Sequence, residues 1–399
     1  MTRFANISGS ADPLRPDFPA GLPITRVNLA NVRHNWLFLA SLARTLPPLA
    51  AVKSDAYGHG LEPVSRVLLD AGCRTFAAGS VLEGVLLRQY LADAGADITI
   101  LPLLGVLSHE EATLAIANNL LPLVSSSEQA GFVSAAWQGS GPLPVAVKVE
   151  TGMARLGFRA QEMQDCVSTL RSLGNLKPVM LLSHLAAADD PAQDASVTKQ
   201  VERFLAAHAA LREYWPDIVL SLANSAAHMA QDIHLAAVPQ QIARLGFSLF
   251  GGNPLCGTSR ESLGSPLRPT MEVVAPVMGV YDLAEGMTVG YGCTFTAQER
   301  MRVAVIGIGY ADGFPRSLSS KGHVCIRGKR CPIIGRICMQ MHMVRVDHVP
   351  DAASGDAAFI LGGEGDGAIS MQDLAQEWGT IPHEIFCSFG KNRRIYCSE

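Results

Sequence analysis

The sequence predicts an α/β protein: a parallel (β/α)8 TIM barrel followed by a mainly β C-terminal domain. Three observations lead to this fold class. The chain has 399 residues, which is more than one hydrophobic core usually holds. From about residue 46 to residue 251, short apolar runs alternate with helix-like stretches. Beyond residue 269, strand-like runs follow one another through turns.

The first part of the chain contains eight apolar runs of strand length. They occupy residues 46–52, 75–81, 97–104, 120–126, 143–149, 179–185, 217–224 and 241–251. The stretches between them, such as 61–72 and 194–215, carry charges on one face and apolar residues on the other, which is typical of amphipathic helices. Eight strand–helix alternations in roughly 200–250 residues suit a parallel barrel, with a doubly wound open sheet as the competing arrangement. We expect the barrel.

The second part has a different texture. A joint rich in Gly, Ser and Pro, residues 251–269, precedes it. Strand-like runs then occupy residues 271–283, 302–311, 323–335 and 342–349. One helix is predicted among them, because Ser370 is a suitable N-cap with Asp373 three residues later and Gly379 at the end. The predicted boundaries are an N-terminal extension at 1–23, the barrel at 24–255 and the β domain at 256–399.

Composition excludes several classes of function. The formal net charge is -4, and no basic block occurs, so nucleic acid is not an expected partner. The nine cysteines are odd in number and form no CxxC motif, which indicates reduced thiols in a cytosol and no metal site. The first twenty residues contain prolines and charges where a signal peptide needs an apolar stretch. We therefore expect a cytoplasmic protein without a membrane partner.

Polar residues gather at the C-terminal ends of the eight runs, the face where barrel enzymes carry out their chemistry. They include Lys53, Lys148, His184 and Arg244. A lysine desolvated at a strand end is a nucleophile toward aldehydes, so pyridoxal phosphate is its natural partner. The segments 225–227 and 246–248 begin loops whose backbone N–H groups could hold a phosphate.

Nine motifs together resemble, in this order, those of bacterial alanine racemases. They are AVKSDAYGHG, VKVETGMARLGF, SHLA, ANSAA, RLGFSLFG, VGYGCTF, GYADGFPR, GRICMQM and HEIFCSFG. The resemblance runs from about residue 24 to the C-terminus. It implies a pyridoxal-phosphate isomerase that makes D-alanine for peptidoglycan. It also implies a barrel, a β domain and a homodimer whose active sites use residues from both subunits.

The resemblance also implies roles for individual residues. The catalytic pair would be Lys53, which binds the cofactor covalently, and Tyr291, which reaches in from the partner chain. The cofactor phosphate would be held by Tyr57, by Ser225 and by the backbone of Gly246 and Phe247. Arg244 would face the pyridine nitrogen, with His184 behind it.

Physical reasoning agrees with the roles of Lys53, Tyr291 and Arg244. Inverting an α-carbon requires a base on each face of the substrate, and Lys53 and Tyr291 would supply them. A cationic Arg244 should keep the pyridine nitrogen unprotonated, which weakens the ring as an electron sink and disfavours side reactions. A decarboxylase of similar architecture would instead place an acidic residue at the pyridine nitrogen.

Further positions follow from the same resemblance. Lys148 is a candidate for carboxylation by carbon dioxide, the alternative being an ordinary surface pair with Glu150. The substrate carboxylate would contact Arg155, which also orients the catalytic tyrosine, and the backbone N–H of Met339. The entry channel would be lined by Tyr310, Arg316 and Arg336, the alternative being a polar rim without catalytic effect.

Three positions depart from the family pattern. Gln340 replaces an aspartate, Phe250 a tyrosine, and His383 a tyrosine that touches the phosphate and narrows the pocket. His383 could substitute as a phosphate ligand, or it could leave room for serine or another small amino acid. A racemase of broader specificity and a non-catalytic pyridoxal-phosphate binding protein therefore stand as alternatives to an alanine racemase.

Overall fold

The structure, a computed structural model, describes residues 22–92, 97–230 and 235–398, and these form two compact units. One unit is Leu29–Thr270, and the other joins residues 22–28 to Met271–Ser398. The units therefore differ from the predicted boundaries at 24 and 256. The predicted extension at 1–23 lies outside the described residues, except for its last two.

Pairing and side-chain contacts explain both differences. Strand β1 (Ile24–Asn28) pairs antiparallel with β11 (Met271–Leu283) and parallel with β19 (Arg393–Cys397), so it belongs to the β-rich unit. The segment 251–270 stays with the barrel. Asn35 of α1 (Leu29–Ser41) donates to the Arg268 carbonyl at 2.9 Å and accepts from the Arg268 N–H at 2.8 Å.

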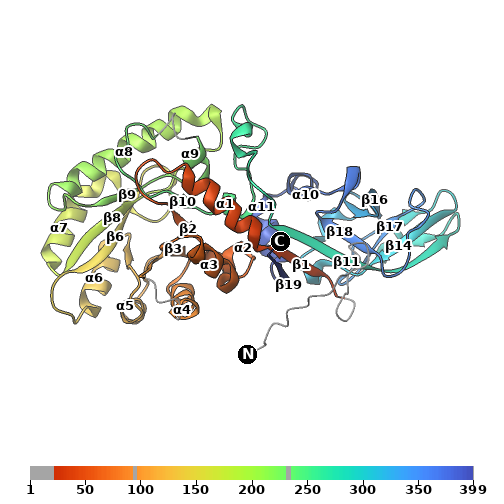
Figure 1. The fold of residues 1–399 in the computed structure, drawn as a ribbon, viewed down its shortest axis with the longest axis horizontal. Coiled ribbons are helices and arrows are strands. Elements are labelled where there is room, and N and C mark those ends of the chain that lie inside the picture. Colours follow the sequence, from red (N-terminus) through yellow and green to blue (C-terminus); the bar gives the residue numbers. More distant parts are fainter. Residues whose placement is uncertain (1–21, 93–96, 231–234, 399) are drawn as a thin grey trace. The chain divides into compact units, whose positions relative to one another are not determined.

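The first unit is the predicted barrel (Figure 1), and its strands are all parallel. They are β2 (Leu49–Ala51), β3 (Thr75–Ala78), β4 (Thr99–Pro102), β5 (Leu123–Val124), β6 (Leu143–Glu150), β8 (Leu176–Leu182), β9 (Val219–Ser221) and β10 (Arg244–Leu245). A short strand β7 (Phe158–Arg159) pairs with β6. The outer helices are α3 (Leu61–Asp70), α4 (Val81–Tyr90), α5 (His109–Ala117), α6 (Ser127–Ala136), α7 (Met163–Leu173) and α8 (Asp194–Arg212).

Backbone hydrogen bonds close the ring. The strands form two arcs, β10-β2-β3-β4 and β5-β6-β8-β9. Leu121 N–H donates to the Ile100 carbonyl at 2.8 Å, and Ile242 N–H donates to the Leu220 carbonyl at 2.8 Å. Apolar side chains fill the interior; they include Leu49, Ala77, Leu101, Leu123, Ala146 and Leu182. The barrel is therefore a packed core, with its polar groups at the strand ends.

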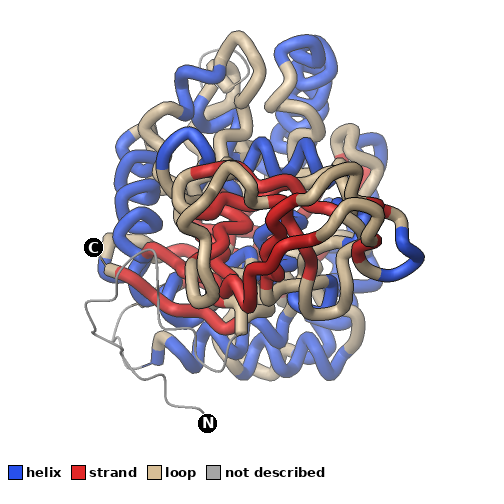
Figure 2. Tube along the Cα trace, turned by 90° about the vertical axis from the view of Figure 1, so that its right-hand side faces the viewer, coloured by secondary structure: helices blue, strands red, loops and turns tan. Residues whose placement is uncertain are grey.

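The β-rich unit is built on one sheet whose order is β14-β17-β16-β15-β18-β11-β1-β19 (Figure 2, strands in red). Its further strands are β14 (Met301–Ile306), β15 (His323–Ile326), β16 (Lys329–Ile334), β17 (His342–Arg345) and β18 (Ala357–Leu361). The long strand β11 pairs with β18 through its first half and with β14 through its second half. This double pairing closes six of the strands on themselves. The short strands β12 (Thr288–Val289) and β13 (Phe295–Thr296) form a hairpin.

Two α-helices accompany these strands among the described residues, where the sequence predicted one. Helix α10 (Met371–Trp378) has the predicted capping box of Ser370 and Asp373 and ends at Gly379 in the left-handed conformation. The expectation of a single helix was wrong, because α11 (Pro382–Phe389) follows. Pro382 at the first helical position favours a helix start, and the buried side chains of Ile385, Phe386 and Phe389 form one apolar face.

The described residues give three further results. All nine cysteines are free thiols. No cluster of His, Cys, Asp or Glu that could hold a metal ion occurs in the part of the chain that the structure covers. Within the same ranges, none of the helices combines the length and the apolar character needed to span a bilayer.

A buried histidine supports the loops at one end of the β-rich unit. His342 is 0% exposed, and its Nδ1 donates to the Ile308 carbonyl at 2.9 Å. Its Nε2 has no hydrogen-bond partner among the described residues, and its ring packs against Phe314. Burial lowers the pKa of His342 from 6.5 to about 4. The ring is therefore neutral at physiological pH.

We predict that His342 makes the protein less stable in acid. The unfolded state binds the proton first, so the stabilisation is complete above pH 6.5 and is lost as the pH falls from 6.5 toward 4. The full loss is about 3 kcal/mol. Urea unfolding at pH 7.5 and pH 4.5 should show a smaller acid loss for His342→Leu than for the wild type. Equal losses in the two proteins would contradict the assignment.

Candidate active site

Lys53 stands at the start of an unusual turn directly after strand β2. The short element α2 (Lys53–Tyr57) has φ angles of 53° to 55° at residues 54–57, so these four residues are left-handed. For residues other than glycine this costs roughly 1–2 kcal/mol each. The turn places the Lys53 Nζ 5.9 Å from the centroid of the Tyr57 ring. Two predicted site residues are thereby held side by side.

The residues predicted to hold a phosphate meet at the neighbouring strand end. The Gly246 N–H donates to the Ser225 hydroxyl at 3.2 Å. A Cβ at Gly246 would lie 2.5 Å from the Tyr57 hydroxyl oxygen, so only glycine permits this approach. Asn224 caps α9 (Ser225–Met229) by accepting from the Ala227 N–H at 3.0 Å. The hydroxyls of Tyr57 and Ser225 and the backbone from Gly246 therefore form one polar cradle, which fits a phosphate-bearing cofactor.

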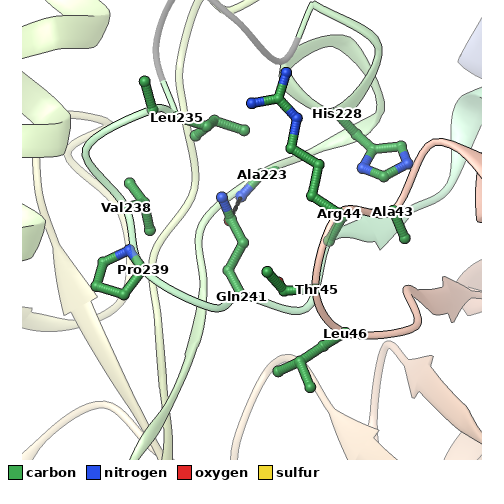
Figure 3. A pocket seen from close by; sticks show the side chains of 12 residues that line it. Ala43, Arg44, Thr45, Leu46, Ala223, His228, Leu235, Val238, Pro239 and Gln241 are labelled. Atoms are coloured by element: carbon green, nitrogen blue, oxygen red, sulfur yellow. Dashed lines mark hydrogen bonds between the residues drawn. The ribbon is translucent and has the colours of Figure 1, made fainter.

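Gln241 supports the strand end that leads into this cradle. Its Oε1 accepts from the Ala223 N–H at 3.1 Å and from the Leu222 N–H at 3.4 Å. Figure 3 shows the Gln241 side chain pointing toward Ala223, in the wall of a cavity of about 180 Å³ that the connections before β2 and β10 also line. Ala243 lines the same cavity, and successive strand residues point to opposite sides. The cavity therefore lies on the other side of β10 from Arg244.

Arg244 is held rigidly, and none of its hydrogen-bond partners among the described residues is a carboxylate. It is 5% exposed, and its Nη1 donates to the carbonyl and hydroxyl oxygens of Ser221 at 2.6 and 2.9 Å. Its Nη2 donates to the Ser183 carbonyl and to the Nδ1 of His184, the latter at 3.0 Å. Burial, and then Arg155, lower the pKa of Arg244 to about 10, so it stays cationic at pH 7.

His184 is neutral and has a defined tautomer. Since arginine can only donate, the Nδ1 of His184 must accept, and the ring proton sits on Nε2. Burial, followed by the charges of Arg244 and Arg155, lowers the pKa of His184 to about 3. The predicted pair of Arg244 with His184 behind it is therefore present in the barrel.

Lys148 lies in a field of positive charges. Burial, and then the positive charges of Arg155, Arg244 and Lys53, together lower its pKa from 10.5 to about 8. Glu150 is turned away to the loop, where its Oε1 accepts from the backbone N–H groups of residues 152–154 within 2.8 Å. An anion is the natural complement of this group of cations.

Arg155 also lines a cavity at the ends of strands β4, β5 and β6. The cavity measures about 430 Å³, and its lining includes Leu107, Ser125, Gln129, Phe132, Arg155 and Arg159. The side chains of Leu107 and Leu156 beside it are 74% and 43% exposed. The barrel mouth therefore offers an open, partly apolar space next to its cations.

Sequence reasoning missed a buried polar network that supports these loops. Gln200 of α8 is 2% exposed, donates to the His184 carbonyl at 3.1 Å and accepts from the Ala186 N–H at 2.9 Å. It also donates to Thr151, whose hydroxyl lies 2.8 Å from that of Ser183. A polar residue on the inner face of a predicted helix is the only signal that the sequence offers for Gln200. The network ties the loop of Arg155 to the loop of His184.

The remaining predicted residues lie in the β-rich unit, where three motifs come together. A Cβ at Gly292 would lie 2.6 Å from the Arg336 guanidinium, so Arg336 packs on the turn that carries Tyr291. The Tyr310 N–H donates to the Cys338 carbonyl at 3.2 Å, and the Ala311 N–H to the Met339 carbonyl at 2.9 Å.

Exposure at this cluster is high for such large side chains. Tyr291 is 72% exposed, Met339 57% and Tyr310 44%. Arg316 begins a short 3-10 helix, and His383 lies in the first turn of α11. The side chains of Tyr291, Met339 and Tyr310 contribute little to the core of their unit, which is consistent with a role toward a ligand or a partner.

Two family models match this chain, one over most of each unit. The family model "Alanine racemase, N-terminal domain" matches residues 27–254, and "Alanine racemase, C-terminal domain" matches residues 270–396. The chain is 43% identical over 371 residues to the alanine racemase of Lawsonia intracellularis, covering 92% of this chain and 95% of the relative.

Two solved structures have the same fold. The alanine racemase of Bartonella henselae with covalently bound pyridoxal phosphate superposes with a TM-score of 0.83 at 28% identity, covering 94% of this chain and 99% of that one. That of Bacillus anthracis with bound L-Ala-P gives 0.84 at 26% identity, covering 94% and 95%.

We predict that Lys148 of the cofactor-free protein reacts with acetic anhydride with a midpoint near pH 8 rather than 10.5, because its pKa is lowered to about 8. The labelled fraction should rise as the pH passes through that value and the amine loses its proton. Mass spectrometry of the peptide containing Lys148 measures this fraction. Removing one repelling charge in Arg155→Ala should move the midpoint upward, and an unchanged midpoint near 10.5 in the wild type would refute the prediction.

Proposed function

The chain belongs to the alanine racemase family, and we propose that it interconverts L-alanine and D-alanine with Lys53 and Tyr291 as its two bases. The observation that carries the proposal is the meeting of Lys53, the phosphate cradle and the Arg244–His184 pair in one barrel mouth. Pyridoxal phosphate supplies the electron sink that makes the α-proton of an amino acid acidic. The residues around it bind, orient and move protons.

Arg244 would face the pyridine nitrogen of the cofactor. Its charge is retained at pH 7, and its neighbours are carbonyls, a hydroxyl and a neutral imidazole. Because the pKa of Arg244 stays near 10, its guanidinium would donate a hydrogen bond to the ring nitrogen and keep its own proton, so the sink stays moderate. This supports racemisation over decarboxylation.

Tyr291 would act from the partner subunit of a homodimer on the face of the substrate opposite Lys53. Its exposed phenol on the turn held by Arg336 supports this role. The exposed apolar side chains at the barrel mouth, Leu107 and Leu156, support a covered surface there. An isolated subunit would then be inactive.

Lys148 is proposed to carry a carboxyl group from carbon dioxide. A pKa of about 8 leaves roughly a tenth of the amine neutral at pH 7, enough to react. The amine nitrogen bonds to the carbon of CO2 and releases one proton. The anion formed would replace a repulsive charge beside Arg155 with an attractive one.

The other assignments concern the substrate and its path. We propose that Arg155 and the backbone N–H of Met339 hold the substrate carboxylate, that His383 contacts the cofactor phosphate, and that Tyr310, Arg316 and Arg336 line the entry. In the cytoplasm, the D-alanine formed would serve peptidoglycan synthesis.

We predict that Tyr291→Phe retains pyridoxal phosphate but loses turnover. Tyr291 is not among the groups proposed to bind the cofactor, so the bound cofactor, measured by its visible absorption, should match the wild type. Racemisation in both directions should fall by at least about 100-fold, the range that general-base removal produces. Unchanged turnover would rule out the two-base assignment.

We predict that the protein forms much D-alanine from L-alanine and little D-serine from L-serine. Chiral chromatography measures both products. Serine is tested because the His383 side chain is smaller than the tyrosine that the family usually carries, which could leave room for a larger substrate. Comparable D-serine would favour the broader-specificity racemase. Bound cofactor without either product would favour a binding protein.

A further inference from the structure

The left-handed turn after Lys53 requires support from outside its own backbone. Internal bonds exist, such as Ala56 N–H to the Val52 carbonyl at 2.8 Å and Gly60 N–H to the Asp55 carbonyl at 2.9 Å. Yet four consecutive left-handed residues persist only where the surroundings determine the conformation. The groups that touch this turn from neighbouring elements therefore decide where Lys53 points.

Glu83 makes such a contact from the first turn of α4. Its Oε1 accepts from the Asp55 N–H at 3.2 Å, and its Oε2 accepts from the Gly79 N–H at 2.8 Å. Gly79 follows β3, and β3 is the neighbour of β2 in the barrel. One carboxylate thus joins the turn after Lys53 to the end of the adjacent strand.

The glycine at position 79 keeps this arrangement possible. A Cβ there would lie 2.6 Å from the Glu83 Oε2, a distance at which the carboxylate has to move. The same Cβ would be 3.5 Å from the Lys53 Cβ, which is an ordinary contact. Lys53, Gly79 and Glu83 are therefore packed as one unit.

Two further helices of the barrel have the same type of N-terminal cap. In α5, Ser108 caps the helix, and the Glu111 carboxylate accepts from the Leu107 N–H at 2.9 Å. In α6, Ser126 caps the helix, and the Gln129 amide oxygen accepts from the Ser125 N–H at 2.9 Å. Glu83, with Ser80 as its N-cap, repeats this pattern and adds the bond to Asp55. Since Gln129 performs the capping role, a glutamine at 83 should preserve the cap.

We propose that Glu83 is a positioning residue for Lys53. It holds the left-handed turn so that the Lys53 amine and the Tyr57 hydroxyl face the bound cofactor together. This inference rests on the proposed assignment of Lys53 as the lysine that binds pyridoxal phosphate.

The test compares Glu83→Gln with Glu111→Gln, which alters the matched cap without the Asp55 contact. Each apoprotein is titrated with pyridoxal phosphate, and the visible absorption band of the bound cofactor is followed against pH. Glu83→Gln should weaken cofactor binding about tenfold, the effect of losing one charge-assisted hydrogen bond, and should shift the pH midpoint of the band. Glu111→Gln should leave both unchanged, with both variants melting within a few degrees of the wild type.

Gly79→Ala tests the same contact from the other side, because it displaces the carboxylate while keeping its charge. It should shift the band in the same direction as Glu83→Gln. If both Glu83→Gln and Gly79→Ala bind cofactor like Glu111→Gln with unshifted bands, Glu83 is only a cap and the inference is wrong. Failure of the wild type to bind pyridoxal phosphate at Lys53, seen by reduction with borohydride and mass spectrometry, would instead overturn the proposed function.

Discussion

The site depends on the repulsion among cations gathered at the barrel mouth. The positive charges of Arg155, Arg244 and Lys53 all lower the pKa of Lys148. Removing one of these groups from water without a counter-charge is unfavourable, so the cluster raises the free energy of the folded protein until an anion binds. A phosphate, a carboxylate and a carboxylated lysine are each anions that would relieve it. The repulsion that destabilises the empty site would therefore increase its affinity for an anionic cofactor and substrate.

Such a cluster requires rigid supports that carry no charge of their own. Arg244 is surrounded by the oxygens of Ser221 and Ser183 and the neutral His184 ring, which supply hydrogen bonds without neutralising it. Behind this layer, Gln200 and Thr151 tie two strand-end loops together with uncharged groups. Where a carboxylate is used, as in Glu150, it points at backbone N–H groups rather than at the cations. The supports thus fix the cations and preserve their charge for a ligand.

The eight barrel strands and helix α10 could be predicted, because periodicity and capping are local properties of the chain. The confirmed fold class was predicted from the strand–helix alternation in the first part of the chain, with a doubly wound sheet as the competing arrangement, and from the succession of strands in the second part. The placement of β1 with β11 and β19 could not be predicted, since a five-residue strand carries no signal for its partner. Helix α11 was missed because it begins without a side-chain N-cap, whereas α10, which has the same length of eight residues, begins with a capping box. Glu83 shows a Ser-x-x-Glu cap in the sequence, but its second bond joins residues 28 positions apart and exists only through the pairing of β2 with β3.

The departure at position 250 shows how the support of Tyr57 tolerates change. Phe250 is 1% exposed, and its ring lies 5.0 Å from that of Tyr57 and 4.4 Å from that of His59, the latter pair stacked. A tyrosine here would bring a hydroxyl that needs a partner in a buried place, whereas phenylalanine keeps the packing without that demand. The ring packing against Tyr57 therefore needs no hydroxyl at position 250. The other two departures, Gln340 and His383, lie in the β-rich unit.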